Sequence, residues 1–310
     1  MSKISILGHH FSKTELSENI KNIPRFTYRQ GFTRLTNESH FFPLRSDTYW
    51  GCCIRCGQSM LFQYMLKFYH NQNKTKDEKN SLISETEVNA QILQDFNDVP
   101  DVRFSIHNFC REITKLGGHE GQYVSVSKLA VVIKNLLTPD YPVYVSENST
   151  IVKDHIEPLF ESGKTVLCLI PMKCGINTFD QEFAPLIQLA TGFDTGLGFI
   201  SGYKRRAYYF VGFDFEKFYY FDPHETKSFV SQVDDYKSYY EPELKSISLK
   251  DISPSLMLCF AWDTKEQMEE TFYILSTLPG TYPIVFIDHQ YEPKLLENTE
   301  NTWELIEHDV

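Results

Sequence analysis

The sequence has no stretch long and apolar enough to cross a membrane as a helix, which needs about 20 predominantly apolar residues. Near the N-terminus, the short apolar stretch at residues 4–7 is followed directly by two histidines, so no secretory signal peptide is visible. We therefore expect a cytoplasmic protein whose thiols stay reduced.

Excess positive charge and an even number of cysteines are also lacking. The 30 Lys and Arg residues are outnumbered by 41 Asp and Glu residues, a net charge of -11, which argues against a nucleic-acid partner. Seven cysteines cannot all pair, so we expect free thiols or catalytic groups rather than a disulfide framework. No cofactor motif such as a glycine-rich phosphate loop is visible.

Hydrophobic periodicity predicts an α+β protein, with helices early in the chain and most strands later. Helices are predicted at 52–70, 128–137 with Ser127 as cap, and 264–275. Strands are predicted at 165–171, 207–213, 217–221 and 284–287, and a polar loop at 71–80. We expect one domain over residues 1–290 and a flexible acidic tail over residues 291–310.

Cys52 follows Trp50-Gly51 and opens the first predicted helix. The N-terminus of a helix carries partial positive charge and unpaired N–H groups, and both stabilise a reactive thiolate. Two other interpretations remain open at this point. The cysteines of this helix could be small buried residues, or Cys53 and Cys56 could form half of a zinc site, for which no suitable second pair is visible.

Asp222-Pro223-His224 ends an aromatic strand. In an extended chain, side chains two positions apart lie on the same face, so Asp222 and His224 would project together. A thiol, an imidazole and a carboxylate are the groups that nucleophilic acyl transfer requires. Alone, the pair could be a surface hydrogen bond, and its weight comes from its combination with Cys52.

The chain resembles the autophagins, cysteine peptidases also called autophagy-related protein four, along nearly its whole length. The stretch from Asp47 to Gln58 is similar to the family signature Asp-x-Gly-Trp-Gly-Cys-Met-x-Arg-x-Gly-Gln, and Asp222-Pro223-His224 to its Asp-Pro-His. Shorter matching elements lie at residues 6–8, 26–32, 104–107, 202–212 and 253–255.

The resemblance implies a papain-like fold with a small inserted subdomain. It implies Cys52 as nucleophile, His224 as general base and acid, and Asp222 as the group that orients His224. It also implies an oxyanion-hole role for the Tyr28 hydroxyl, although a half-buried strand tyrosine is the simpler interpretation of Tyr28. No metal site is implied.

The implied substrate is a GABARAP-like ubiquitin-like protein, both as a precursor and as its phosphatidylethanolamine conjugate on autophagic membranes, which the enzyme would contact peripherally. The chain would cut after the C-terminal glycine of this partner. Among the site residues, Trp50 and Tyr123 are expected to contact the substrate, Tyr123 standing where the family has a tryptophan that clamps the glycine tail.

The chain departs from the family pattern near the site. Tyr49 replaces the glycine before the signature tryptophan, and Lys204 replaces the proline of a regulatory loop. Altered loops leave open a catalytically impaired binding protein, and another ubiquitin-like-protein protease or an acyltransferase is a further alternative.

The acidic tail contains Trp303 and Ile306 in an aromatic-x-x-aliphatic pattern. Such a segment can add a strand to the sheet edge of a partner, with both side chains in pockets. Family tails carry similar motifs, so we expect Trp303 and Ile306 to bind the modifier. Docking of Trp303 on the body of the protein is the alternative.

Overall fold

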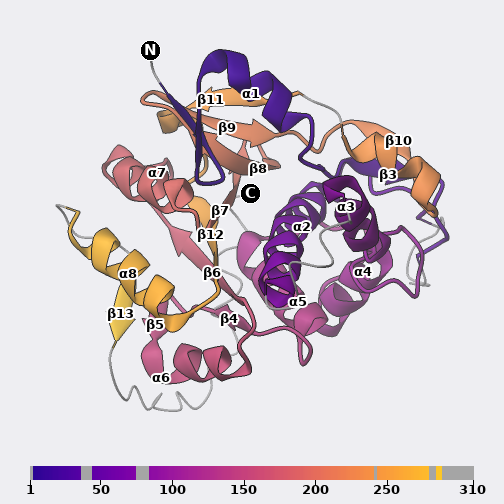
Figure 1. The fold of residues 1–310 in the computed structure, drawn as a ribbon. Helices are drawn as coiled ribbons and strands as arrows, with labels where there is room; N and C mark the ends of the chain where they lie inside the picture. Colours follow the sequence, from indigo (N-terminus) through magenta and orange to yellow (C-terminus); the bar gives the residue numbers. More distant parts are fainter. Residues whose placement is uncertain (1–2, 36–43, 75–83, 241–242, 279–283, 288–310) are drawn as a thin grey trace.

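The computed structural model describes residues 3–35, 44–74, 84–240, 243–278 and 284–287. Its centre is a nine-stranded, mostly antiparallel sheet (Figure 1). The path through the sheet runs β11 (Lys245–Ser248), β9 (Lys217–Phe221), β8 (Arg206–Phe213), β7 (Gly196–Tyr203), β12 (Ser255–Trp262), β6 (Val166–Lys173) and β4 (Val143–Val145). Strand β1 (Ile4–Ile6) pairs with β2 (His9–Phe11) and with the end of β8.

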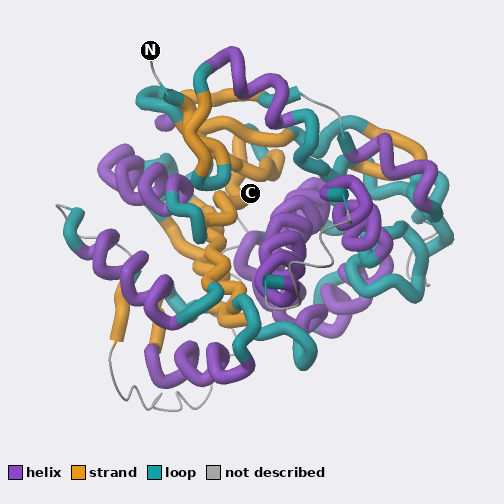
Figure 2. Tube along the Cα trace, viewed as in Figure 1, coloured by secondary structure: helices purple, strands orange, loops and turns teal. Residues whose placement is uncertain are grey.

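Helices cover both faces of the sheet (Figures 1 and 2). One side carries α2 (Cys52–Asn73), α3 (Glu85–Gln94), α4 (Ile106–Lys115) and α5 (Val126–Leu137). The other carries α7 (Ala184–Gly192) and α8 (Lys265–Ser276), with the short α6 (Lys153–Ile156) below in this view. Helix α1 (Lys13–Ile20) lies above in this view, and its Ile20 packs in the same core as α2. Two short parallel pairs lie off the main sheet: β3 (Tyr28–Gln30) with β10 (Thr226–Ser228), and β5 (Thr150–Val152) with β13 (Val285–Ile287).

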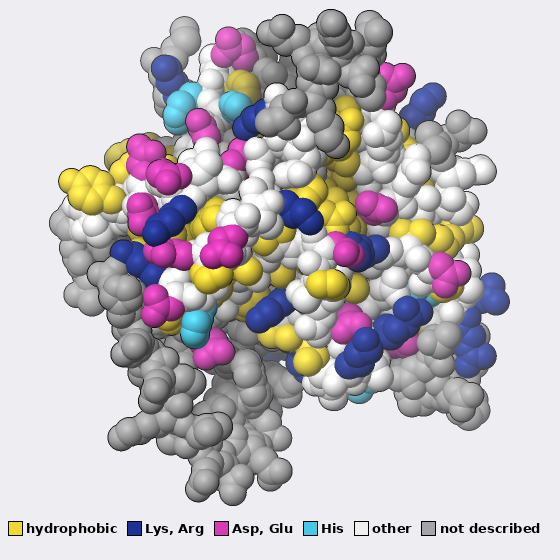
Figure 3. Space-filling model, turned by 60° about the horizontal axis from the view of Figure 1, so that its bottom comes forward, with side chains coloured by type: hydrophobic (Ala, Val, Ile, Leu, Met, Phe, Trp, Pro, Cys, Tyr) yellow, Lys and Arg dark blue, Asp and Glu magenta, His cyan; other side chains and the backbone are white. Residues whose placement is uncertain are grey.

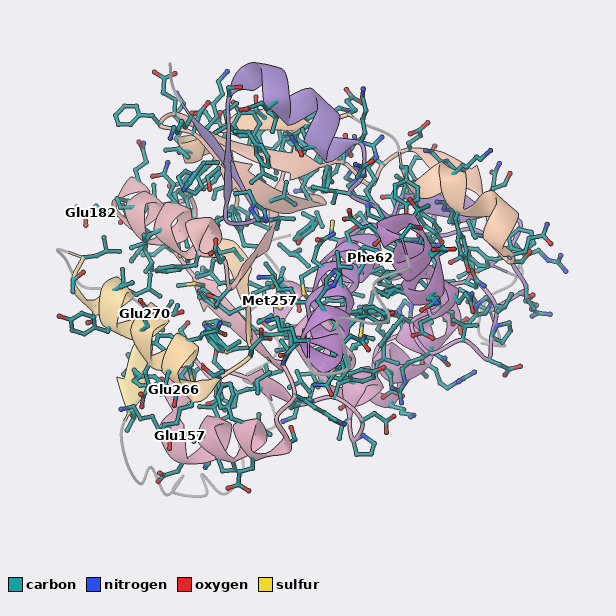
Figure 4. All side chains as sticks on the ribbon, viewed as in Figure 1. Phe62, Glu157, Glu182, Met257, Glu266 and Glu270 are labelled. Atoms are coloured by element: carbon teal, nitrogen blue, oxygen red, sulfur yellow. The ribbon has the colours of Figure 1, made fainter. Side chains whose placement is uncertain are left out.

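Alternation along β12 divides the interior into two cores. Met257, Cys259 and Ala261 pack on the α2 side, whereas the intervening side chains, such as Leu258, pack on the side of α7 and α8. Met257 of β12 and Phe62 of α2 have no exposed surface, and the Phe62 ring meets Phe96, just after α3 (Figure 4). Burial of each such side chain contributes about 1.5–3 kcal/mol, so the core on the α2 side holds α2 firmly in place.

The α+β prediction is confirmed, and the predicted helices and strands are present with shifted ends. Two details were wrong. Ser125, not Ser127, caps α5, because its hydroxyl accepts the backbone N–H of Lys128. Asn71–Asn73 continue α2 instead of starting the predicted loop. The inserted subdomain stays a prediction, and the tail at 291–310 lies outside the described residues.

A fully buried guanidinium ties the loop before α2 to the rest of the chain. Arg55 donates from Nε to Asp47 Oδ2 at 2.8 Å and from one terminal nitrogen to Asp98 Oδ1 at 2.8 Å. None of the three side chains has exposed surface. Asp47 in turn holds the turn before the helix, because its carbonyl accepts the backbone N–H groups of Trp50 and Gly51.

Replacing Arg55 with Met should destabilise the fold by about 3–5 kcal/mol, because the change leaves two buried carboxylates without their partner. Urea unfolding of Arg55→Met would measure the loss. Lys115→Met is the matched control, since the Lys115–Glu112 pair is exposed on its lysine side and should contribute less than about 1 kcal/mol. Equal losses in the two variants would contradict a structural role for the buried network.

Candidate active site

Cys52 is the first residue of α2, directly after the N-cap Gly51. The turn that leads to it needs glycine at position 51, because a Cβ there would collide with the carboxylate of Asp47. Gly51 offers no side-chain cap, so the N–H groups of the first turn remain available to a negatively charged group. The Cys52 side chain is only 2% exposed.

His224 reaches Cys52 from the other side of the site, just after β9. Its Nδ1 lies 2.6 Å from Asp222 Oδ1, and its backbone N–H donates to the same oxygen at 3.1 Å. The predicted projection of both side chains from one strand end is therefore present. This leaves Nε2 for Cys52. Nε2 is buried and has no competing hydrogen-bond partner among the described residues.

The electrostatics of the site favour a thiolate beside an imidazolium. Burial opposes ionisation of Cys52, but hydrogen bonds from His224, the Ala207 backbone and Tyr28 outweigh it, so the pKa of the Cys52 thiol is lowered. Burial likewise opposes protonation of His224, yet its bonds with Asp222 and Cys52 raise the pKa of the imidazole. Both shifts move the proton from sulfur to nitrogen.

Tyr28 lies over the same two groups. It is buried, its hydroxyl hydrogen-bonds with Cys52, and its ring meets the His224 ring edge-on, with centroids 5.4 Å apart. Burial and the neighbouring Cys52 raise the pKa of the phenol, so the hydroxyl keeps its proton and can donate. A proton donor next to the sulfur and to the N–H of Cys52 is placed to stabilise an oxyanion.

Two further residues of the site are not among the predicted functional residues. Lys245 on β11 donates to Asp222 Oδ2 at 3.0 Å, the carboxylate oxygen that His224 does not use. Burial tends to raise the pKa of Asp222, but the bonds from His224 and Lys245 together lower it. Tyr208 packs its ring against His224, with centroids 5.0 Å apart. Only pairing of β11 with β9 brings Lys245 here, so no local pattern indicates it.

The residues expected to contact the substrate differ in how exposed they are. Trp50 is 8% exposed and donates its indole N–H to the Ser46 carbonyl, so it offers little surface to a substrate and instead fills the core. Tyr123, in contrast, is 56% exposed. It precedes α5, whose Leu129 packs against Gly57 in the second turn of α2. Trp303 and Ile306 lie outside the described residues.

The other two cysteines of α2 do not share the environment of Cys52. Cys53 and Cys56 are buried in the hydrophobic core, and burial raises the pKa of both thiols. They are therefore poor thiolates, which matches the interpretation of these two cysteines as small buried residues.

The sequence matches the Peptidase C54 catalytic domain over residues 13–273. Cysteine protease ATG4A of Xenopus laevis is 27% identical over 299 residues, covering 83% of this chain and 74% of that protein. Human cysteine protease ATG4A is 26% identical over 299 residues, covering 82% and 73%. Cysteine protease ATG4B of Xenopus laevis is 25% identical over 303 residues, covering 86% and 77%.

Fold and comparisons together define a cysteine protease with a papain-like α+β fold. The chain belongs to the Peptidase C54 family, and its resemblance to the autophagins is confirmed. No helix among the described residues has the length and apolar character needed to cross a membrane.

Alkylation by iodoacetamide should show the lowered pKa of Cys52. Because a lowered pKa keeps the thiol ionised as the pH falls, the rate should persist below pH 9.0, the ordinary pKa of a thiol. In His224→Ala the acid limb should move to higher pH. The signal is specific because the other six cysteines are buried and burial raises their pKa values. Identical pH profiles in the two proteins would show that His224 does not activate this thiol.

Lys245 should act as a positioning residue for Asp222. In Lys245→Met we expect kcat/KM to fall by up to about tenfold, because a partly exposed ion pair contributes about 1 kcal/mol or less. The acid limb of the pH profile should move upward, because the pKa of Asp222 returns toward 3.8 when the ammonium is lost. Lys245→Arg keeps the charge and should restore the limb. An unmoved limb in Lys245→Met would restrict Lys245 to a structural role.

Proposed function

We propose that this chain hydrolyses the bond after the C-terminal glycine of a GABARAP-like ubiquitin-like modifier, with Cys52, His224 and Asp222 as catalytic groups. One observation carries the proposal. A thiol at the first turn of a long helix, with its pKa lowered, contacts an imidazole that is itself held by a carboxylate. Because the chain belongs to a family of cysteine proteases, the family supports hydrolysis of a peptide-type bond by a thiol nucleophile.

The reaction follows from these contacts. The Cys52 thiolate attacks the glycyl carbonyl, and the Tyr28 hydroxyl and the Cys52 N–H stabilise the oxyanion that forms. His224 gives its proton to the leaving amine, the carbon–nitrogen bond breaks, and a thioester remains. His224 then takes a proton from water, the hydroxide displaces the thiolate, and the modifier leaves with a free glycine carboxylate.

The same steps serve two leaving groups. In a precursor, the leaving amine is the next residue of the peptide. In a lipid conjugate, it is the amine of phosphatidylethanolamine, so the chain would also remove the modifier from autophagic membranes while touching them only peripherally. A membrane-bound substrate needs no membrane-spanning segment in the enzyme.

Entry of the glycine tail requires movement at the β7–β8 hairpin. The backbone of Ala207, near the start of β8, hydrogen-bonds with Cys52, and the thiol is 2% exposed. The hairpin turns through Lys204 and Arg205, both with left-handed φ values of 49° and 61°. We infer that this hairpin covers the thiol at rest and that a bound modifier displaces it.

The net charge of -11 fits a protein partner better than a nucleic acid. On the face in Figure 3, acidic and basic side chains are interleaved and no broad basic surface is visible. We propose that residues 1–290 form the catalytic unit. We propose further that the tail at 291–310 captures the modifier through Trp303 and Ile306.

Cleavage of a GABARAP-like precursor with a C-terminal reporter tests the proposal. Wild type should cut after the glycine, whereas Cys52→Ala and His224→Ala should lose at least about a thousandfold in kcat, because groups that act as a unit are lost together. A lipid-conjugated substrate on vesicles tests removal of phosphatidylethanolamine in the same series.

Deletion from residue 297 onward should raise KM and leave kcat unchanged, since the tail is proposed to bind and not to react. Binding of the precursor without any cleavage by wild type would contradict the peptidase proposal and favour a catalytically impaired binding protein. Cleavage that survives Cys52→Ala would exclude Cys52 as the nucleophile.

A further inference from the structure

Tyr49 adopts a backbone conformation that an aromatic residue rarely takes. Its φ is +76°, in the left-handed region that favours glycine. The residue is the third of a four-residue turn in which the Asp47 carbonyl accepts the N–H of Trp50 at 3.2 Å, and also that of Gly51 at 2.8 Å. A positive φ at the third position of a β-turn normally selects glycine. The family signature accordingly has glycine where this chain has Tyr49.

The described residues give the Tyr49 side chain no contact that would offset this strain. It is 79% exposed, and it makes no hydrogen bond or ring contact with any residue of the described chain. Its neighbour Trp50 shows the opposite behaviour, with a buried ring and a bonded indole N–H. The turn therefore directs the Tyr49 ring outward and the Trp50 ring into the core. A strained conformation without internal compensation indicates a role at a functional site.

The exposed Tyr49 ring lies close in sequence to the candidate nucleophile, Cys52. Only two residues separate Tyr49 from Cys52, and three steps of chain span at most about 11 Å. The Arg55–Asp47 pair and the contact of Gly51 with Asp47 fix the turn, so the ring has a defined base at the edge of the candidate active site. A polypeptide that lies across Cys52 passes within reach of it.

We propose that Tyr49 is a substrate-contacting specificity residue, whose ring packs against the glycine-terminated tail of the modifier as this tail crosses Cys52. The proposal rests on the proposed function and adds a contact that the family glycine cannot make. The terminal glycine has no side chain, so its flat peptide groups are open to contact beside the scissile bond. A tyrosine ring supplies a large, rigid contact surface for such a chain, because only two side-chain angles become fixed.

The Tyr49 ring and Tyr123 would share the contact with the glycine-terminated tail. Tyr123 is also exposed, and it precedes the helix that packs along the first turns of α2. Where the family has a tryptophan in a clamp, this chain has the smaller Tyr123. A second aromatic ring on the nucleophile turn restores contact area that the smaller residue gives up.

Steady-state cleavage of the precursor reporter by Tyr49→Gly, Tyr49→Ala and Tyr49→Phe tests the proposal. Glycine removes both the ring and the strain, alanine removes the ring and keeps the unfavourable φ, and phenylalanine keeps the ring. We expect KM to rise about five- to thirtyfold in Tyr49→Gly and Tyr49→Ala, which is typical of a lost aromatic contact, with kcat nearly unchanged. Tyr49→Phe should stay within about twofold of wild type.

Tyr273→Ala is the matched control, because Tyr273 is 71% exposed on α8 and its loss should leave KM unchanged. A thermal unfolding midpoint of Tyr49→Gly at or above that of wild type would show that the higher KM does not come from unfolding. Cleavage by wild type with an equal KM in Tyr49→Gly would overturn this inference and leave the proposed function standing. Failure of wild type to cleave the precursor would overturn both.

Discussion

A single buried charge organises the candidate active site. Arg55 has no access to water, so its guanidinium must find its partners within the protein. It takes one carboxylate from the loop before α2 and another from Asp98, more than forty residues later in the chain. The residue that supplies the loop carboxylate, Asp47, also holds the turn that ends at Gly51 through its backbone carbonyl, and the turn sets where Cys52 begins the helix. Asp47, Gly51 and Arg55 take no part in the chemistry, but together they fix the position of the nucleophile Cys52.

The short strand β3 joins the two halves of the site. The N–H of Tyr28 donates to the Pro223 carbonyl at 2.9 Å, and the N–H of Arg29 donates to Asp47 Oδ1 at 2.6 Å. Successive N–H groups of a strand point in opposite directions, so neighbouring residues grip the histidine loop on one side and the cysteine loop on the other. The fully buried Arg29 anchors the strand through the Ser228 carbonyl and the Ser238 hydroxyl. The distance between thiol and imidazole therefore depends on β3, a strand of three residues. Such a strand is too short to show a recognisable hydrophobic pattern in the sequence.

Features that depend on a local pattern could be predicted from the sequence, whereas features that depend on contacts between separate segments could not. The long apolar face of α2, the strand ending at Phe221 and the pair of Asp222 and His224 carry local patterns, and each is where the pattern predicts. Lys245 could not be found in this way, because pairing of β11 with β9 brings it to Asp222 from 23 residues away. Tyr208 lies in the predicted hairpin, but no local pattern indicates that its ring packs against His224. The burial of Trp50 was missed for a related reason. A tryptophan next to a nucleophile fits a substrate contact as well as a core residue, and only the direction of the turn distinguishes the two.

Cys52 and Cys53 show how narrow the conditions for a reactive thiol are. Both side chains are buried, and burial alone would make each of them inert. The pKa of Cys53 is indeed raised, and nothing nearby offsets the loss of water. One residue earlier, hydrogen bonds from an imidazole, a phenol and a backbone N–H reverse the direction of the shift. The helix start supplies the setting, but these three donors select which thiol ionises. Each donor comes from a different strand or loop, so the reactivity of Cys52 exists only in the assembled fold.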